Sequence, residues 1–315
     1  MSRKIAIIGA GHVGATIAND LMIQGLAAEI VLIDINEAKA VGEAMDIYQS
    51  APFSRPVVVR AGEYEDARGA DIVIITSGVA RKPGMSRLDL AQTNTDMLKD
   101  ITPKIVSVAP KAIYVIVSNP VDILTYVFCK LSGLPHNQVL GSGTILDTSR
   151  LQTFLSQRFH ISPKNIHAQV YGEHGDSSFV PWSMVRIANN RIEDYVKHSP
   201  DADKICWDGD FKQIEERVHK AGGQIIERKG ATFYAAAMTV CHICRCIFDG
   251  VGTALTVSSM MHGEYGVDDV CLSTMTMVDG SGVRGIIETP LTEEEIGKLK
   301  DSAAKMRKVI ESLDV

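Results

Sequence analysis

Short runs of β-branched and other apolar residues recur through the first half of the chain, and longer amphipathic stretches separate them. Each run is apolar throughout rather than at every second residue, which is typical of strands that helices cover on both faces. Strands that alternate with helices in this way predict βαβ units and a doubly wound parallel sheet, an α/β fold. The runs are KIAIIG, EIVLID, PVVVR, DIVIIT, AIYVIV and QVLGSG, which lie within residues 4–143.

The pattern changes past Gly141. We expect a long helix for TILDTSRLQTFLSQRF, then two short strand-like runs, NIHAQVYG and MVRI, and then further helices. The last helix is amphipathic, and Thr292 and Glu295 predict a capping box at its start. The sequence therefore predicts two domains in one compact unit: residues 1–141 with the parallel sheet, and residues 142–315 with a mixed α+β fold.

Composition excludes several classes of protein. Of 315 residues, 45% are hydrophobic and 22% are charged, as in soluble globular proteins. The 32 Lys and Arg against 38 Asp and Glu give a net charge of −6, and no basic run offers a surface for nucleic acid. Uncharged stretches such as residues 5–19 are shorter than the ~18 apolar residues of a membrane span. We expect neither a nucleic-acid partner nor a membrane span.

The six cysteines form no disulfide framework, and free thiols suit a reducing compartment, which favours the cytoplasm. Three of them, in CHICRC, resemble a metal cluster, but they lie in a helix-like stretch with no second pair of ligands at zinc-site spacing. We therefore expect buried thiols and no metal. The cysteines are Cys129, Cys206, Cys241, Cys244, Cys246 and Cys271.

A glycine motif, GAGHVG, follows the first apolar run and opens a helical stretch. In such a turn Gly9 permits the tight bend, Gly11 lets the backbone approach a pyrophosphate, and Gly14 lets helix and strand pack closely. Asp34 ends the second run, where its carboxylate can accept both ribose hydroxyls and would repel the 2′-phosphate of NADP. Residues 1–141 are therefore predicted to form a Rossmann domain that binds NAD.

Two further segments follow predicted strands, at the edge where a parallel sheet presents ligands. TSGVARKPGMSRLDL holds Arg81, Lys82 and Arg87; such a loop is usually solvated surface, but beside a cofactor it can serve as a closing lid. SNPVDI has Asn119 at a strand end, where its amide can bind the nicotinamide or a substrate oxygen, or where Asn-Pro only forms a turn. The residues alone leave both alternatives open.

ILDTSR and YGEHGDS carry an acid, a base and a histidine. Asp147 and Arg150 are three residues apart on a predicted helix and therefore share one face. His174 follows a predicted strand in a glycine-flanked turn. A lone His is more often structural. A carboxylate on one ring nitrogen, however, would fix the tautomer and raise the pKa of the His, leaving the other nitrogen to exchange a proton near neutral pH.

Six motifs together resemble a known family, the NAD-dependent L-lactate/L-malate dehydrogenases. GAGHVG, the acid at the end of the second strand, SNPVD, LDTSR, GEHGDS and KGATFY occur in the family's order and spacing over essentially the whole chain. The resemblance implies that His174 donates and accepts the proton, that Asp147 orients it, and that Arg87 on the lid polarises the substrate carbonyl. Residues 142–315 would then form the substrate-binding and catalytic domain.

The resemblance also implies which other residues touch the substrate and the cofactor. The substrate-binding residues are Arg81, Arg150, Asn119 and Thr232. The residues that contact NAD are Gly9, Gly11, His12, Val13, Gly14, Asp34, Thr76, Gly78, Asn94 and Asn119.

The motifs point to two different substrates. GEHGDS and Thr232 resemble the lactate branch, whereas Arg81 stands at a lid position that is usually Gln in lactate enzymes and Arg in malate enzymes. A pocket difference the size of a methylene is worth ~1–3 kcal/mol, whereas an Arg81 left unpaired beside pyruvate loses about 2–5 kcal/mol. We therefore expect oxaloacetate, which gives L-malate, to be reduced better than pyruvate, which gives L-lactate. The alternative is that Arg81 stays outside the closed site and pyruvate is preferred.

Two other classes share a fold or motif of this kind. NAD-dependent glycosidases need a larger substrate domain and a metal site, neither of which the sequence offers. A non-catalytic NAD sensor would need the glycine motif but not the four charged residues of the predicted site together.

By resemblance we expect a homotetramer. Allosteric relatives bind fructose 1,6-bisphosphate with a His and an Arg. Here His167 occupies the first position and Gln152 the second, so little activation is expected.

Overall fold

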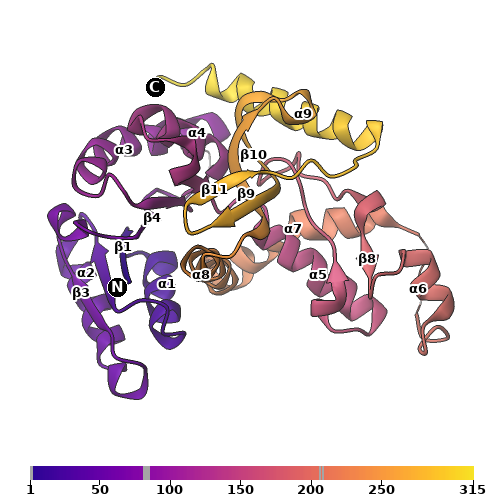
Figure 1. The fold of residues 1–315 in the computed structure, drawn as a ribbon, viewed down its shortest axis with the longest axis horizontal. Helices are drawn as coiled ribbons and strands as arrows, with labels where there is room; N and C mark the ends of the chain where they lie inside the picture. The colour runs from indigo at the N-terminus through magenta and orange to yellow at the C-terminus, as the bar shows by residue number, and fades with distance from the viewer. Residues whose placement is uncertain (1–2, 81–85, 206, 208) are drawn as a thin grey trace.

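The computed structural model describes residues 3–80, 86–205, 207 and 209–315. Within these residues the centre is a nine-stranded sheet with the order β11-β10-β9-β6-β5-β4-β1-β2-β3 (Figure 1). Every apolar run predicted from the sequence overlaps one of six parallel strands, so the doubly wound α/β fold is confirmed. These strands are β1 (Lys4–Ile8), β2 (Glu29–Ile33), β3 (Val58–Ala61), β4 (Ile72–Ile75), β5 (Ile113–Ile116) and β6 (Val139–Gly141).

Successive residues of these strands point to opposite faces, and each face has its own helices. In β1, Ile7 packs in the core that includes α1 and α2, whereas the next residue, Ile8, packs in the core that includes α3 and α4. Figure 1 shows α3 and α4 above β1 and β4, and α1 below them. The helices are α1 (His12–Ile23), α2 (Glu37–Tyr48), α3 (Arg87–Val108) and α4 (Val121–Ser132).

The second half of the chain begins with the predicted long helix, which is α5. The two strand-like runs that follow it contribute only two-residue strands, β7 and β8, which pair with each other. Further helices follow, as expected. The elements are α5 (Ile145–Phe159), β7 (Ile166–His167), β8 (Arg186–Ile187), α6 (Ile192–His198), α7 (Phe211–Lys229), α8 (Tyr234–Asp249), β9 (Thr253–His262), β10 (Asp268–Asp279), β11 (Gly282–Ile286) and α9 (Glu293–Ile310).

Strands β9, β10 and β11 were not predicted from the sequence. They extend the parallel sheet with antiparallel strands, and the junction is the pairing of Gly141 on β6 with Ser258 on β9. Polar residues such as Ser258, Ser273 and Thr274 are fully buried in these strands. These strands therefore lack the continuous apolar run of the parallel strands, and the brief alternation of Thr274 to Met277 in β10 was not recognised as a strand.

Helix α8 links the two halves of the chain. Its residues Cys241 and Cys244 are fully buried in the core that also contains α1 and α2. The sheet and this core thus both continue past residue 141. The division into domains at residue 142 stays a prediction.

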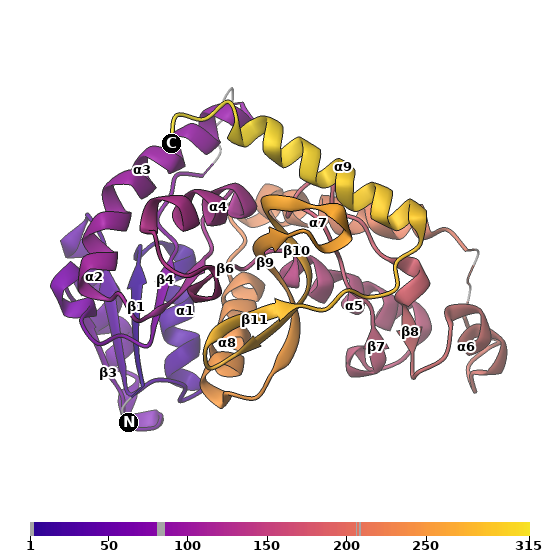
Figure 2. The same cartoon turned by 45° about the horizontal axis from the view of Figure 1, so that its top comes forward.

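The last helix, α9, begins with the predicted capping box. Thr292 Oγ1 accepts the Glu295 N–H at 3.2 Å, and Glu295 Oε2 accepts the Thr292 N–H at 2.8 Å. The helix runs along the top of the molecule towards α3 (Figure 2), where Asp314 accepts from Lys99 Nζ at 3.1 Å. Neither α9 nor any other helix in the described part of the chain is long and apolar enough to cross a membrane.

Candidate active site

The glycine turn between β1 and α1 is closely packed. Gly9 has φ +111°, a conformation that disfavours any residue with a side chain, and a Cβ on Gly14 would lie 1.9 Å from the Gly9 carbonyl oxygen. Gly11 is the N-cap of α1, and among the described residues no side chain caps this helix and no atom lies within 4 Å of a Cβ built on Gly11. The first N–H groups of α1 can therefore bind an anion such as a pyrophosphate.

Asp34 follows β2 beside this turn. Its Oδ2 accepts the Ala10 N–H at 2.6 Å and its Oδ1 accepts the Asn36 N–H at 2.8 Å. Thr76, directly after β4, donates from Oγ1 to the Gly9 carbonyl at 2.9 Å. Main-chain donors and a fixed carboxylate at the carboxyl ends of these strands suit the pyrophosphate and ribose of a dinucleotide. The residues present therefore fit NAD.

Asn94 connects two loops at the same edge of the sheet. Its side chain donates to the Asn119 carbonyl at 2.7 Å and accepts the Val79 N–H at 2.9 Å. A Cβ on Gly78 would lie 3.3 Å from Asn94 Oδ1. Asn94 thus holds the loops after β4 and β5 together, and the contacts of Asn94 and Gly78 with NAD stay predictions.

Asp147 on α5 contacts both Arg150 and His174. Its Oδ1 accepts from Arg150 Nη1 at 2.9 Å, and its Oδ2 lies 2.5 Å from His174 Nδ1. The Asp147 side chain is 9% exposed and that of His174 is 24% exposed, so the acid is covered while the ring reaches the surface of a cavity. Because Nδ1 faces a carboxylate, Nε2 is the ring nitrogen left to exchange a proton.

The pairing changes the pKa of both partners. The Asp147 charge raises the pKa of His174 above its ordinary value, although burial and Arg150 act in the opposite direction. Burial raises the pKa of Asp147, but the charges and hydrogen bonds of His174 and Arg150 more than offset this and hold that pKa below its ordinary value. Near neutral pH the arrangement therefore favours an ionised Asp147 beside a protonated His174.

These groups line a cavity of about 300 Å³ between the two halves of the chain. The structure brings Val13, Asn119 and Thr232 to its walls together with the Asp147, Arg150 and His174 cluster. Only some of the lining residues were singled out from the sequence. Of the others, Asp176 belongs to the motif GEHGDS, whereas the lining residues on α7 belong to no recognisable motif. The lining residues that the sequence analysis did not single out are Val117, Ser142, Gly143, Leu146, Gly175, Asp176, His219, Gly222, Gly223, Ile226, Ala236 and Thr239.

Part of the predicted lid, and one of the six cysteines, lie outside the described residues. Arg81, Lys82 and Cys206 are outside the described residues, and so is the side chain of Arg87, whose main chain begins α3. His12 is described: its exposed ring stacks on Phe233 with 5.4 Å between ring centroids. This contact brings the KGATFY segment to the glycine turn.

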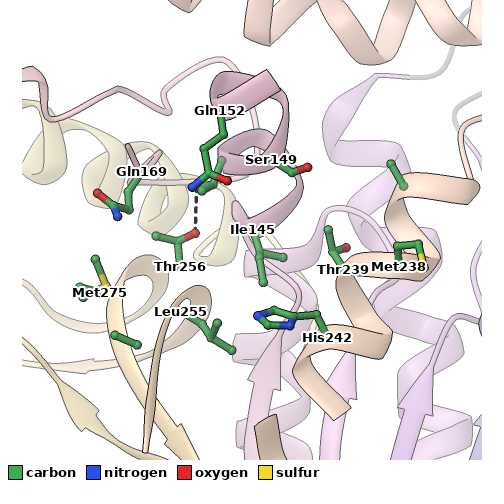
Figure 3. Close-up of a pocket in the computed structure, with 13 residues that line it drawn as sticks. Ile145, Ser149, Gln152, Gln169, Met238, Thr239, His242, Leu255, Thr256 and Met275 are labelled. Atoms are coloured by element: carbon green, nitrogen blue, oxygen red, sulfur yellow. Dashed lines mark hydrogen bonds between the residues drawn. The ribbon is translucent and has the colours of Figure 1, made fainter. Parts of the chain in front are cut away.

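A larger cavity, of about 540 Å³, lies between α5, α8 and strands β9 and β10. Figure 3 shows Gln152 and Ser149 from α5 on one side and His242 and Met238 from α8 on the other. His242 is the only ionisable side chain in the described lining. Because it has no paired acid and base, this cavity is not suited to proton transfer despite its size.

The three cysteines of CHICRC are buried thiols on α8. Burial raises the pKa of the Cys244 thiol to about 12, so the thiolate that binds metals is disfavoured. In the described part of the chain no three His, Cys, Asp or Glu residues lie together in a way that could hold a metal ion.

A doubly wound sheet with a dinucleotide-type turn, next to a cavity that holds a carboxylate–histidine pair, defines the class of NAD-dependent dehydrogenases. Residues 3–141 match the family model described as lactate/malate dehydrogenase, NAD binding domain. Residues 144–314 match the lactate/malate dehydrogenase, alpha/beta C-terminal domain. The chain belongs to the lactate/malate dehydrogenase family, and its cofactor is NAD.

Curated relatives and solved structures agree with this family. The chain is 46% identical over 312 residues to an L-lactate dehydrogenase of Thermoanaerobacterium saccharolyticum, covering 99% of both chains. It is 47% identical over 311 residues to L-lactate dehydrogenase 1 of Clostridium acetobutylicum, covering 98% of both. The crystal structure of a minor L-lactate dehydrogenase from Enterococcus mundtii is 36% identical with a TM-score of 0.94, covering 100% of this chain and 99% of that one.

Proposed function

We propose that the chain is an NAD-dependent L-2-hydroxyacid dehydrogenase of the lactate type, which interconverts pyruvate and L-lactate. The observation that carries this proposal is the cavity in which Asp147, Arg150 and His174 meet. The names of the relatives support the choice of pyruvate. A 2-keto acid has a carboxylate that needs a cation and a carbonyl oxygen that needs a proton donor, and this cluster supplies both.

His174 is the proposed proton donor and acceptor. During reduction the carbonyl oxygen of the keto acid takes the proton from Nε2, and the product is a hydroxyl group. Reduced NAD supplies the hydride that the carbonyl carbon accepts. Asp147 stabilises the protonated ring before transfer and keeps the ring oriented afterwards. In the oxidation of the hydroxy acid, neutral His174 takes the proton back.

Four cationic or polar groups are proposed to orient and polarise the keto acid. The Arg150 guanidinium has five N–H donors, so it can bind the substrate carboxylate while one nitrogen stays on Asp147. Asn119 and Thr232 line the same cavity and limit the size of the substrate. Arg87 is proposed to polarise the carbonyl, as the family resemblance implies.

An absorbance assay tests this function directly. With pyruvate and the purified protein, we expect rapid loss of NADH absorbance at 340 nm. NADPH should serve much less well, because the Asp34 carboxylate is proposed to repel its 2′-phosphate. If neither pyruvate nor oxaloacetate oxidised NADH, the protein would instead be a binding protein without this activity. Equal rates with NADPH would contradict the role of Asp34.

Oxaloacetate is the second candidate substrate, and Arg81 in the sequence is the observation that favours it. A guanidinium that enters the closed site would pair with the second carboxylate of oxaloacetate, and pyruvate offers no such partner. The comparison of kcat/KM for the two acids, in the native protein and in Arg81→Gln, decides between them. If Arg81 selects the substrate, its replacement lowers the oxaloacetate-to-pyruvate ratio by at least about tenfold. An unchanged ratio would mean that Arg81 does not contact the substrate.

A homotetramer is the proposed assembly. Val41, Met45 and Tyr48 on α2 recur at helical spacing on one face, and each is about half exposed. On α8 the apolar Tyr234 and Met238 are also more than half exposed, and Met238 borders the larger cavity (Figure 3). Exposed apolar faces of this kind favour association between copies. Light scattering should give a mass near four times 34.2 kDa, and a monomer would contradict the proposal.

We propose that the protein lies in the cytoplasm. We also propose that fructose 1,6-bisphosphate does not activate it. The five cysteines of the described residues are free, as suits a reducing compartment. Gln152 donates to the Ala168 carbonyl at 3.2 Å and offers no positive charge for a phosphate group near His167. Adding fructose 1,6-bisphosphate should therefore leave the apparent KM for pyruvate nearly unchanged, and a large drop would contradict this.

A further inference from the structure

Asp122 lies directly behind His174. It belongs to the first turn of α4, three residues after Asn119, and only 3% of its surface is exposed. Its Oδ2 accepts the main-chain N–H of His174 at 2.7 Å. His174 is therefore held by two carboxylates: Asp147 at its ring, and Asp122 at its main chain.

The second oxygen of Asp122 has a different environment. Oδ1 is buried without a partner of hydrogen-bond geometry among the described residues, and so is Oγ of the neighbouring Ser258 on β9. Burial raises the pKa of Asp122 to about 6; Ser258, the His174 N–H and the His174 charge lower it, and Glu173 raises it. On β10 the Asp122 charge helps to raise the pKa of the buried Cys271 thiol, so this thiol is a titratable group near Asp122. The carboxylate therefore changes its charge within the pH range of ordinary assays.

A hydrogen bond to the His174 N–H does not by itself require a carboxylate. The oxygen of an amide side chain would accept the same N–H without burying a charge. Burying a charged carboxylate disfavours the folded state. The hydrogen bond to the His174 N–H therefore does not explain why this position holds a charged carboxylate rather than a neutral amide.

We propose that Asp122 is a positioning residue for His174: its carboxylate anchors the main chain of the histidine, and its negative charge favours the protonated ring that donates the proton. This inference rests on the proposed role of His174 and deepens it. Asp147 makes the larger contribution because it contacts the ring directly, and Asp122 adds to it from behind.

The effect has a defined pH window. Above about pH 6 Asp122 is ionised, and its charge raises the pKa of His174 in addition to the effect of Asp147, while Arg150 lowers that pKa. Below this pH Asp122 is neutral and no longer raises the pKa of His174, although its oxygen can still accept the His174 N–H. As the pH rises and His174 tends to lose its proton, Asp122 gains the charge that opposes the loss. The pH range of carbonyl reduction is thereby extended upward.

The main test is Asp122→Asn, which keeps an oxygen for the His174 N–H and removes the charge. The His174 ring is titrated by NMR in ring-labelled protein, and its signal is assigned from its absence in His174→Gln. We expect the apparent pKa of His174 to fall by about 0.5–1 unit in Asp122→Asn. A folded variant with an unshifted titration overturns the inference. This titration needs no activity, so its failure is distinct from a failure to reduce pyruvate.

The pH profile of kcat/KM for pyruvate is the second readout. We expect the high-pH fall of the profile to begin about 0.5–1 pH unit lower in Asp122→Asn than in the native protein. The two profiles should converge below about pH 5.5, where Asp122 is already neutral in the native protein. A loss by the same factor at every pH would mean that Asp122 acts through structure alone, and would overturn the role of its charge.

Two further variants keep the test sharp. Glu295→Gln removes another buried carboxylate, one that accepts the Ser183 hydroxyl at 2.7 Å and caps α9, and the His174 titration should not move. An equal shift in this control would overturn the specific role of Asp122. Ser258→Ala removes the hydroxyl that lowers the pKa of Asp122, so the charge appears only at higher pH. The His174 pKa should then fall by less than in Asp122→Asn. If Asp122→Asn does not fold, an unshifted titration in Ser258→Ala overturns the inference.

Discussion

Strands β4 and β5 and strands β9 and β10 belong to one sheet, but they bury different side chains. The four residues of β4 are all buried and apolar, and β5 differs only in having a tyrosine. In β9 and β10, Ser258, Ser273 and Thr274 are buried as completely as the apolar residues of the first set. Apart from the Tyr114 hydroxyl, the side chains of the first set make apolar contacts, whereas the second set also places several polar side chains inside the protein.

The buried polar groups of β10 support the segments that carry the proposed proton transfer. Ser273 Oγ accepts the Thr144 N–H at 3.0 Å, at the start of the helix that carries Asp147. The main chains of Ser273 and Gly172 exchange hydrogen bonds of 2.9 and 3.1 Å, two residues before His174. The first half of the sheet thus presents the glycine turn, while the second half orients the acid and the histidine.

His174→Ala should have the largest effect, because it removes the proposed proton donor but nothing of the glycine turn. We expect kcat to fall by roughly 10²–10⁴-fold, the usual contribution of a positioned acid–base group. The affinity for NADH, measured by fluorescence titration, should stay within about twofold, since the proposed cofactor contacts lie in the first half. A variant with near-normal kcat would refute the assignment of His174 as the proton donor. A loss of NADH binding would contradict the proposal that the first half binds the cofactor independently of His174.

Gly14→Ala and Gly11→Ala form a matched pair in the first half. A Cβ on Gly14 would collide with the Gly9 carbonyl at 1.9 Å, so we expect a loss of about 3 kcal/mol in the free energy of unfolding. A Cβ on Gly11 meets no described atom within 4 Å, so this variant should keep its stability and lose NADH affinity instead. Chemical denaturation and fluorescence titration measure the two effects. Equal destabilisation by both substitutions would contradict this explanation.

Asp122→Asn should change stability in a pH-dependent way. The pKa of Asp122 is raised from 3.8 to about 6, so the folded state binds its proton more tightly than the unfolded state does. The native protein therefore loses stability, of the order of 2 kcal/mol, as the pH rises from about 4 to above 6. Asn does not ionise and should be the more stable residue at pH 7–8, with no advantage at pH 4. Equal stability of the two proteins at pH 7.5 would contradict a buried, disfavoured charge.

Ser273→Ala should have the smallest of these effects. It leaves the buried Thr144 N–H without its side-chain acceptor, which is expected to lower the free energy of unfolding by about 1–2 kcal/mol. Because Thr144 starts α5, we also expect a modest fall in kcat, of about threefold. Ser312→Ala is the matched control and should change neither quantity, because Ser312 is exposed and its hydroxyl donates to the Val309 carbonyl within its own turn. Lowered stability with an unchanged kcat would mean that β10 does not orient the acid.

The parts of the fold that sequence reasoning found are those with a local signal. The six parallel strands each hold a short apolar run, and the start of α9 is marked by Thr292 and Glu295 at capping-box spacing. Strands β9 and β10 have only a weak local signal, because polar residues such as Ser258 and Ser273 interrupt their apolar residues. Only pairing with β6, far away in the sequence, makes these strands part of the sheet.

The residues of the candidate site also fall into two groups: those that a sequence motif indicated, and those that only the structure placed there. Asp147, Arg150 and His174 were found because acid, base and histidine occur in recognisable motifs. His219 also lines the cavity, but α7 carries no motif that could mark it. Asp122 stands inside the motif SNPVDI, yet nothing in that motif indicates that its carboxylate is buried against His174.

Three features could be recognised from the order of amino acids: the apolar runs that become parallel strands, the glycine spacing that shapes the turn, and the acid, base and histidine of the site. These features depend on steric and hydrophobic preferences over a few neighbouring residues, and such preferences can be seen in the order of amino acids. The meeting of Asp122, Asp147 and His174, from three separate segments, at the wall of one cavity depends on tertiary packing. The physical reason is that burial and the charges nearby set each pKa, and both arise only when distant segments pack together.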